Sequence, residues 1–136
     1  AYSALKKGAP YTSNNSLIII GVGGVGMMGL QIAKAAFNCN PIVIDVDEDK
    51  LKLALENGAI AAINPTDEDA MMKVFEITGG NASVAIDFVG SELSTGFGIN
   101  LLRKGGKYII VGLYGGELKL PLPLIPIMER GIQGSY

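Results

Sequence analysis

The sequence predicts an α/β fold, namely a single domain built on one doubly wound, parallel sheet of six strands. Three observations support this prediction. The chain has 136 residues, about the size of one ordinary domain, and 49% of them are hydrophobic. Short aliphatic runs alternate with stretches of helical periodicity. The 19 glycines fall singly or in pairs at the ends of those runs, where the chain must turn.

The predicted strands are continuously apolar and recur at similar intervals. They begin near residues 17, 41, 60, 84, 107 and 132. Strands without polar alternation are typical of a parallel sheet that is covered on both faces. Right-handed crossovers between such strands then give the doubly wound arrangement.

The segments between the first five strands carry helix signals. Helices are expected at 25–37, 47–56, 67–78 and 91–103. Acidic residues open the second helix, and Asn57-Gly58 ends it. Thr66 is the expected N-cap of the third helix, and Ser91 is the expected N-cap of the fourth.

The two ends of the chain are less regular. Residues 1–16 predict a short helix followed by an exposed loop, and residues 17–136 predict the folded domain. Leu17 to Leu30 has no polar side chain. A membrane span is nevertheless rejected, because this run is shorter than the ~20 residues that a span needs.

Composition excludes several classes of function. A net charge of −2 without a strong basic patch predicts neither nucleic acid nor a membrane as partner. The chain has no histidine and one cysteine, Cys39, although zinc sites, serine triads and most acid–base devices use those side chains. We therefore predict no catalytic residue and no metal ligand here, and we interpret Cys39 as a small buried hydrophobe. Cysteine usage and the absence of a signal pattern favour the cytoplasm.

Acidic residues outside these patterns have structural interpretations. Asp87 lies inside an apolar strand, where a charge needs a partner. We expect it to form hydrogen bonds at the strand end rather than to act in catalysis. The runs 47–49 and 67–69 are expected to be solvated first turns of helices.

A glycine-rich motif follows the first predicted strand. Gly21, Gly23 and Gly26 match the pattern G-x-G-x-x-G, and because glycine is abundant here the match needs support from its context. The motif lies between a predicted strand and a predicted helix, and Asp45 ends the next strand 19 residues after Gly26. This context is typical of a Rossmann fold that binds a dinucleotide. The structural alternative is a packing turn in which Asp45 only caps the next helix.

Each position of the motif has a chemical reason. Gly21 allows a tight turn, Gly23 allows a pyrophosphate to approach the backbone, and Gly26 allows the helix to lie close to the strand. The phosphates would then meet the free N–H groups of the helix N-terminus. Asp45 can accept hydrogen bonds from both ribose hydroxyls, whereas the acidic run 47–49 would repel a 2′-phosphate. The predicted cofactor is therefore NAD rather than NADP.

With these residues, the chain resembles the coenzyme-binding domain of the medium-chain dehydrogenase/reductase superfamily, and within it the zinc-type alcohol dehydrogenases. Asn57-Gly58-Ala59, Ile86 to Gly90, Lys104 to Lys107 and Val111-Gly112-Leu113 follow in the family's order and spacing. The resemblance implies that 45–50 and 88–90 lie by the adenosine half, and 111–113 and the last strand by the nicotinamide. The implied cofactor-binding residues are Gly21, Gly23, Gly24, Val25, Gly26, Asp45, Val46, Lys50, Phe88, Val89, Gly90, Val111, Gly112, Leu113 and Ser135.

The resemblance also implies an activity for the parent protein. It would be an NAD-dependent oxidoreductase that transfers a hydride between the nicotinamide and a small alcohol or carbonyl substrate. Zinc is implied for the parent only, in a catalytic domain that is absent from this chain. The chain is then expected to be a fragment that binds NAD without turnover.

Several alternatives stay open at this stage. One is a non-catalytic dinucleotide-binding module, and another is a zinc-independent quinone or enoyl reductase of the same superfamily. A third is an S-adenosylmethionine-dependent methyltransferase, which also uses a glycine-rich turn and an acid after the second strand. Residues 120–128 and the last strand are expected either to pair two subunits in a homo-oligomer or to fold back on their own domain.

Overall fold

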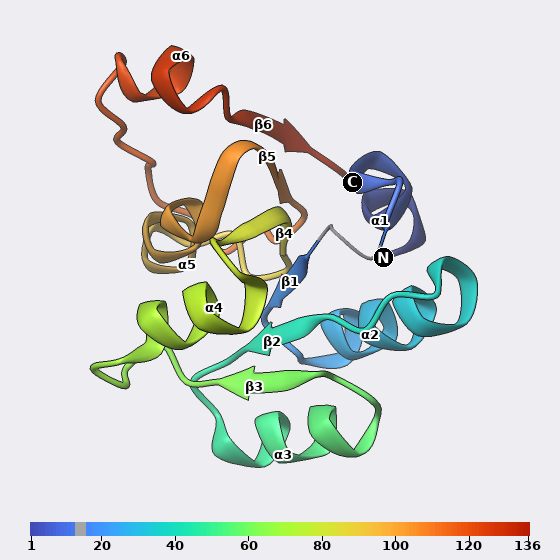
Figure 1. The fold of residues 1–136 in the computed structure, drawn as a ribbon. Coiled ribbons are helices and arrows are strands. Elements are labelled where there is room, and N and C mark those ends of the chain that lie inside the picture. The colour runs from blue at the N-terminus through green and yellow to red at the C-terminus, as the bar shows by residue number, and fades with distance from the viewer. Residues whose placement is uncertain (13–15) are drawn as a thin grey trace.

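The computed structural model describes residues 1–12 and 16–136. Helices and strands alternate along most of the chain (Figure 1). In chain order they are α1 (Tyr2–Gly8), β1 (Leu17–Ile20), α2 (Gly24–Phe37), β2 (Ile42–Ile44), α3 (Glu48–Glu56), β3 (Ala61–Ile63), α4 (Ala70–Thr78), β4 (Ala82–Asp87), α5 (Glu92–Gly98), β5 (Leu102–Ile110), α6 (Leu124–Met128) and β6 (Gly131–Gly134). A 3-10 turn at Ile99–Leu101 joins α5 to β5.

The six strands form one parallel sheet in the order β3-β2-β1-β4-β5-β6. The chain first builds outward from β1 through β2 to β3, and then crosses back to place β4 on the other side of β1. The prediction of a doubly wound sheet is confirmed, and this strand order is that of a Rossmann fold. The order reverses beside β1, so the crevice between the two halves opens at the carboxyl ends of β1 and β4.

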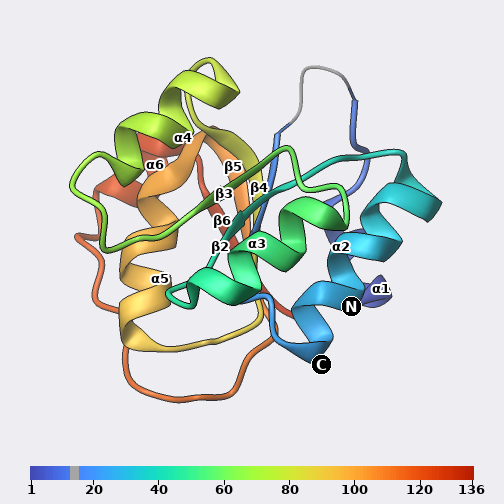
Figure 2. The ribbon, with the colours of Figure 1, turned by 90° about the horizontal axis from the view of Figure 1, so that it is seen from below.

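Helices cover both faces of this sheet (Figure 2). On one face, Leu30 of α2 and Leu51 of α3 pack with Ile19 in a cluster that also includes residues of α1. On the other face, Val74 of α4 and residues of the 3-10 turn pack with Ile18. Because successive residues of a strand point to opposite faces, both Ile18 and Ile19 are buried. The continuously apolar strands of the sequence are thus explained.

Helix α4 begins later than the sequence predicts. The predicted start is Asp67 with Thr66 as N-cap, whereas the helix begins at Ala70. The Thr66 backbone N–H and hydroxyl both donate to the Asn64 side-chain oxygen, at 3.0 and 2.7 Å. The Thr66 side chain is therefore committed to a turn after β3 and does not cap the helix.

Helix α5 ends earlier than predicted, at Gly98 rather than near Arg103. Strand β5 accordingly begins at Leu102, opposite Ala82 of β4. The predicted turn at 104–106 lies inside β5 as an irregularity in its pairing with β4, and Gly105 there has a φ of +80°. The buried side chains of Leu101 and Leu102 hold this segment against the sheet instead of continuing the helix.

The two ends of the described chain lie close together (Figure 1). The predicted first helix is confirmed as α1, and the predicted loop at 12–16 lies partly outside the described residues. The Lys7 ammonium of α1 donates to the Ser135 hydroxyl just after β6, at 2.9 Å. Strand β6 is the outer strand beside β5, and all four of its residues are exposed. Within residues 1–12 and 16–136, no helix has both the length and the apolar character to cross a membrane.

Candidate functional site

The predicted site residues gather along the carboxyl edge of the sheet. Backbone hydrogen bonds join the strand ends there: the Gly21 N–H donates to the Ile44 carbonyl at 2.8 Å, and the Phe88 N–H donates to the Ile20 carbonyl at 2.9 Å. The turns after β1, β2 and β4 are therefore held against one another. This is the crevice in which open α/β sheets bind their ligands.

The glycine turn leads from β1 into α2. Gly21 has a φ of +85°, which favours glycine, and a Cβ on Gly26 would collide with the Gly21 carbonyl oxygen. Gly23 differs, because apart from Gly23 and its two chain neighbours no heavy atom of the described residues lies within 4 Å of the place where its Cβ would be. The predicted packing roles of Gly21 and Gly26 thus have a geometric basis, and the Gly23 backbone faces open space.

The N-terminus of α2 begins at Gly23, which is its N-cap residue and has no side chain. Among residues 1–12 and 16–136 no side chain forms a cap hydrogen bond there, and the first turn of the helix has no acidic residue. The first N–H groups of a helix have no partner within the helix, and its N-terminus carries partial positive charge. Gly24 and the exposed Val25 follow at this end. The turn therefore presents donors to an anion.

Asp45 follows β2 and is half-buried. Its Oδ2 accepts from the Val22 N–H of the glycine turn at 2.9 Å, and its Oδ1 accepts from the Asp47 N–H at 2.9 Å. The N-cap of α3 is Asp47, whose side chain accepts from the N–H groups of Asp49 and Lys50. Asp45 is therefore not the helix cap, and each of its oxygens keeps further acceptor capacity.

A cavity of about 450 Å³ opens beside Asp45. Its walls come from the ends of β1, β2, β3 and β4 and from α5. Of the predicted site residues, Gly21, Asp45, Val46 and Val89 line it. Pro65, Thr66, Leu93 and Phe97 also line it, and sequence reasoning missed them. Leu93 and Phe97 lie one helical turn apart on α5, which is the one signal that pointed to a shared face.

Asp87, the last residue of β4, is fully buried. Its Oδ1 accepts from the Val89 and Gly90 N–H groups at 2.9 Å each. Its Oδ2 accepts from the Ser94 hydroxyl at 2.8 Å and from the Tyr108 hydroxyl at 2.7 Å. The predicted strand-end role is confirmed, because this carboxylate builds the turn from β4 into α5.

Tyr108 was not singled out from the sequence, yet its hydroxyl reaches the Asp87 side chain from β5. Burial, and in second place the Asp87 carboxylate, raises the pKa of Tyr108 above its ordinary value near 10. The hydroxyl therefore stays protonated and continues to donate to Asp87 at neutral pH.

The turn after β5 packs tightly against the turn after β4. The Val111 and Gly112 N–H groups donate to the Asp87 carbonyl at 2.9 and 3.1 Å. A Cβ on Gly90 or Gly112 would collide with the backbone of the opposite turn. Leu113 follows and is exposed. Gly90 and Gly112 thus allow these two turns to lie side by side.

Three of the predicted residues lie apart from this cluster. The Phe88 side chain packs against α2, where its ring would be 3.0 Å from a Cβ on Gly29, and it does not line the cavity. Lys50 is exposed on α3. The Ser135 N–H donates to the Ile110 carbonyl at 2.9 Å, and its hydroxyl is held by Lys7. The structure therefore does not bring these three side chains to the cavity beside Asp45.

Cys39 lies outside the site, after α2. It packs against the core, and burial raises the pKa of its thiol. With Leu17 and Ile42 it lines a depression at the amino ends of β1 and β2, which is the opposite edge of the sheet. Among the described residues, no three His, Cys, Asp or Glu side chains are grouped so that they could hold a metal ion.

Comparison with known proteins agrees with this geometry. A family model described as zinc-binding dehydrogenase matches residues 24–136. An NAD-dependent alcohol dehydrogenase of Sulfurisphaera tokodaii is 38% identical over 136 residues, covering 98% of this chain and 39% of that protein. One of Sulfolobus acidocaldarius is 43% identical over 119 residues, covering 87% of this chain and 34% of that protein.

Solved structures agree as well. The alcohol dehydrogenase of Aeropyrum pernix superimposes with a TM-score of 0.86 at 38% identity, covering 98% of this chain and 39% of that one. An alcohol dehydrogenase of E. coli CFT073, solved with NADH, superimposes with a TM-score of 0.82 at 25% identity. The match covers 98% of this chain and 40% of that one. The chain thus spans about two fifths of the length of these relatives. On the match over residues 24–136, it belongs to the zinc-binding dehydrogenase family.

Proposed function

We propose that this chain is the NAD(H)-binding domain of an alcohol dehydrogenase-type oxidoreductase. The observation that carries the proposal is the Asp45 carboxylate beside the open backbone of the glycine turn. Each carboxylate oxygen accepts one backbone N–H, which fixes its direction and leaves acceptor capacity for the two ribose hydroxyls. Membership of the family and the NAD-dependent relatives support the same cofactor.

The residues of the glycine turn fit a pyrophosphate. A phosphate oxygen can approach the Gly23 backbone because no heavy atom of the described residues occupies the space that a side chain would fill. The uncapped N–H groups of Gly24, Val25 and Gly26 are the expected donors to it. In this arrangement Gly21 and Gly26 act indirectly, by allowing the turn and the helix to lie close together.

The two halves of the dinucleotide would lie along the carboxyl edge of the sheet. Val46 and Val89, which line the cavity, would contact the adenosine half. Lys50 is exposed on α3 outside this cavity, so its contact with the adenosine ribose stays a prediction from the resemblance. The turn at 111–113 and Ser135 would lie by the nicotinamide half. When bound, the nicotinamide supplies the acceptor or donor of the hydride, and the residues of this chain bind and orient it.

The acidic surroundings favour NAD over NADP. Asp47, Glu48 and Asp49 follow Asp45 directly and are exposed. A 2′-phosphate on the ribose would bring negative charge next to the Asp45 carboxylate and toward these side chains. The hydroxyl form of the ribose, by contrast, gains charge-assisted hydrogen bonds from Asp45.

Substrate chemistry belongs to the longer protein, since the chain spans about two fifths of its relatives. The proposed reaction is hydride transfer between NAD and a small alcohol or carbonyl substrate. The described residues do not fit a zinc site, so no zinc step is assigned to them, and the isolated chain is expected to bind cofactor without turnover. A domain rich in cysteine and histidine in the parent reading frame would support this proposal over a zinc-independent reductase or a non-catalytic module.

The outer edge of the sheet supports a homo-oligomer formed through the last strand. All four residues of β6 are exposed, and Leu122 and Ile127 before it are exposed as well. An uncovered edge strand beside aliphatic side chains favours pairing with a second copy. Light scattering on the purified chain tests this, and a monomer at all concentrations would contradict it. The cytoplasmic location stays a prediction.

Calorimetric titration with NADH, NADPH and S-adenosylmethionine tests the cofactor. We expect NADH to bind tightest and S-adenosylmethionine not to bind, because membership of the dehydrogenase family argues against a methyltransferase. Tighter binding of NADPH than of NADH would refute the role of Asp45. Alcohol oxidation by the purified 136-residue chain would refute the division of labour proposed here.

A further inference from the structure

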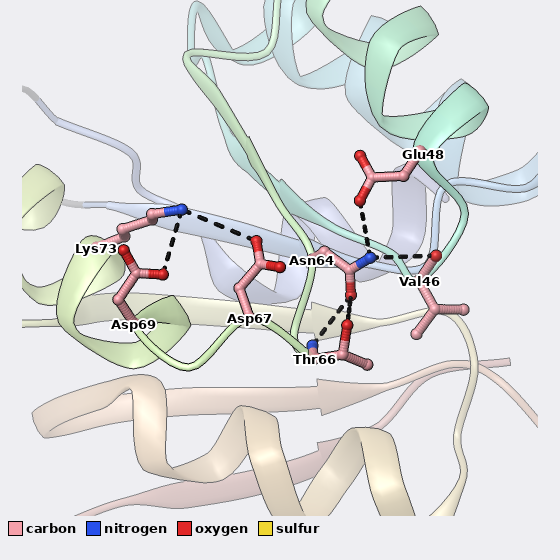
Figure 3. A network of polar contacts seen from close by, with 7 residues as sticks. All are labelled: Val46, Glu48, Asn64, Thr66, Asp67, Asp69 and Lys73. Atoms are coloured by element: carbon pink, nitrogen blue, oxygen red, sulfur yellow. Dashed lines mark hydrogen bonds and ion pairs between the residues drawn. The ribbon is translucent and has the colours of Figure 1, made fainter.

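The Asn64 side chain connects two turns of the crevice (Figure 3). It follows β3 and is half-buried. Its Nδ2 donates to the Val46 carbonyl at 3.3 Å and to the Glu48 Oε1 at 2.9 Å. Its Oδ1 accepts from the Thr66 N–H and hydroxyl at 3.0 and 2.7 Å. Both amide hydrogens and both lone pairs of Asn64 are therefore used.

Each of the connected turns supplies a wall of the 450 Å³ cavity. Asp45 and Val46 come from the turn after β2, and Pro65 and Thr66 come from the turn after β3. Asn64 itself is not among the lining residues. Asn64 is hydrogen-bonded to Val46 and Thr66, which do line the cavity, so it can act on a ligand only through these two residues.

The other restraints on the turn after β2 are mostly local. The Asp47 N–H donates to Asp45, and the Asp49 and Lys50 N–H groups donate to Asp47. Two ties to other strand ends involve Asp45 and so precede Val46: its Oδ2 accepts from the Val22 N–H at 2.9 Å, and its N–H donates to the Ile63 carbonyl at 3.3 Å. Beyond that point, Asn64 makes the contacts that fix this turn to the neighbouring strand end.

We propose that Asn64 is a positioning residue for the adenosine half of the cofactor. By joining the Val46 carbonyl to Thr66, it sets the separation of the two walls before the ligand arrives. A preorganised wall binds more tightly than one that must be ordered on binding. This inference rests on the proposed function, because the adenosine half is placed here by the role of Asp45.

Two variants of the full 136-residue chain test it. Asn64→Ala removes all four hydrogen bonds, and Asn64→Asp keeps the acceptor for Thr66 but loses the donors to Val46 and Glu48 and adds repulsion with Glu48. We expect each to weaken binding of 5′-AMP and of NADH by the same factor, up to about tenfold. The Asp variant is expected to bind no better than the Ala variant, because the tie to Val46 is lost in both.

Lys73→Met is the matched control. Lys73 forms exposed ion pairs with Asp67 and Asp69 at 3.8 and 3.4 Å in the same region (Figure 3), but it does not line the cavity. Its substitution changes the net charge by the same one unit as Asn64→Asp. We therefore expect AMP and NADH affinity close to that of the unsubstituted chain. A loss as large as that of Asn64→Asp would show a general charge effect and overturn the inference.

Thermal unfolding by circular dichroism separates positioning from stability. A positioning role weakens AMP and NADH binding at a temperature where the variants are fully folded. Unchanged affinity in both variants, or a loss for NADH without one for AMP, would overturn the role of Asn64. If the unsubstituted chain bound neither AMP nor NADH, the proposed function itself would fail, and this outcome is distinct from a failure of Asn64 alone.

Discussion

Replacing Gly23 with alanine separates the ligand-binding glycine of the turn from the packing glycines. Gly23 has a φ of −70°, which lies outside the left-handed region that favours glycine. Beyond its two chain neighbours, no heavy atom of the described residues lies within 4 Å of the new Cβ. In Gly26→Ala, by contrast, the Cβ would collide with the Gly21 carbonyl oxygen. The two substitutions add the same methyl group to the same turn. A difference between their effects on stability and on NADH affinity therefore reflects where each methyl group points.

The expected magnitudes follow from these contacts. Alanine is a poorer N-cap residue than glycine, and the difference is small. Gly23→Ala should therefore lower the unfolding free energy by less than about 1 kcal/mol. The methyl group would occupy the approach to the phosphates and lose at least one charge-assisted hydrogen bond, about 1.5–3 kcal/mol or about 10- to 150-fold in affinity. Gly26→Ala must move backbone and should cost about 1–3 kcal/mol of stability.

Calorimetry with NADH and urea unfolding by circular dichroism measure the two effects. Gly96→Ala is the control. Apart from its chain neighbours and the backbone of its own helix, no heavy atom of the described residues lies within 4 Å of its Cβ, and it lies on α5 outside the cavity. It should leave NADH affinity unchanged and stabilise the chain by up to about 1 kcal/mol. A folded Gly23→Ala variant with full NADH affinity would refute the phosphate role of this turn. An unfolded one would refute the open space at Gly23.

Three further predictions concern Asp45 and Tyr108. Asp45→Ser should weaken NADH binding by about 10- to 100-fold and should reduce the ratio of NADH affinity to NADPH affinity. If paired titrations with the two cofactors gave an unchanged ratio, the contact between Asp45 and the ribose would be contradicted. Tyr108→Phe removes a donor from the buried Asp87 and should lower the unfolding free energy in urea by about 1.5–3 kcal/mol; a neutral effect would mean that the bond adds nothing. The pKa of Tyr108 is higher in the folded state than the value near 10 expected in the unfolded state. The stability that the protonated hydroxyl contributes is therefore fully present below pH 10 and is lost as the pH rises further. Burial and the Cys39 thiol raise the pKa of Tyr11 in the same direction, so Tyr108→Phe should reduce the alkaline loss measured between pH 9 and 11 without abolishing it.

The sequence was sufficient for the sheet because its signals are local. Buried strands could be identified from the aliphatic runs at Leu17, Ile42 and Val84 without knowing which strands pair with them. The glycine turn could also be predicted from the sequence. Gly21 is required by its backbone conformation, and Gly26 is required by close packing against Gly21. The doubly wound arrangement also followed, because right-handed crossovers leave few alternatives, whereas the order of the strands came from the structure.

The sequence was insufficient where a side chain has a distant partner. Thr66 has the pattern of an N-cap, but Asn64 engages its hydroxyl and delays the start of α4. Tyr108 has the pattern of an ordinary strand aromatic, and its bond to Asp87 spans 21 residues. Local propensity describes what a residue can do, and the fold decides which of its options is realised.

Hydrogen-bond capacity distinguishes the polar side chains at three neighbouring strand ends. Asp45, Asn64 and Asp87 each follow or end a strand, and each binds the backbone of the next turn. Asp87 accepts two hydrogen bonds on each carboxylate oxygen, and Asn64 uses all four of its sites. Among the described residues, each carboxylate oxygen of Asp45 accepts one hydrogen bond. A strand-end carboxylate with unused lone pairs is the one that can still bind a ligand, which singles out Asp45 and assigns the other two to building the walls around it.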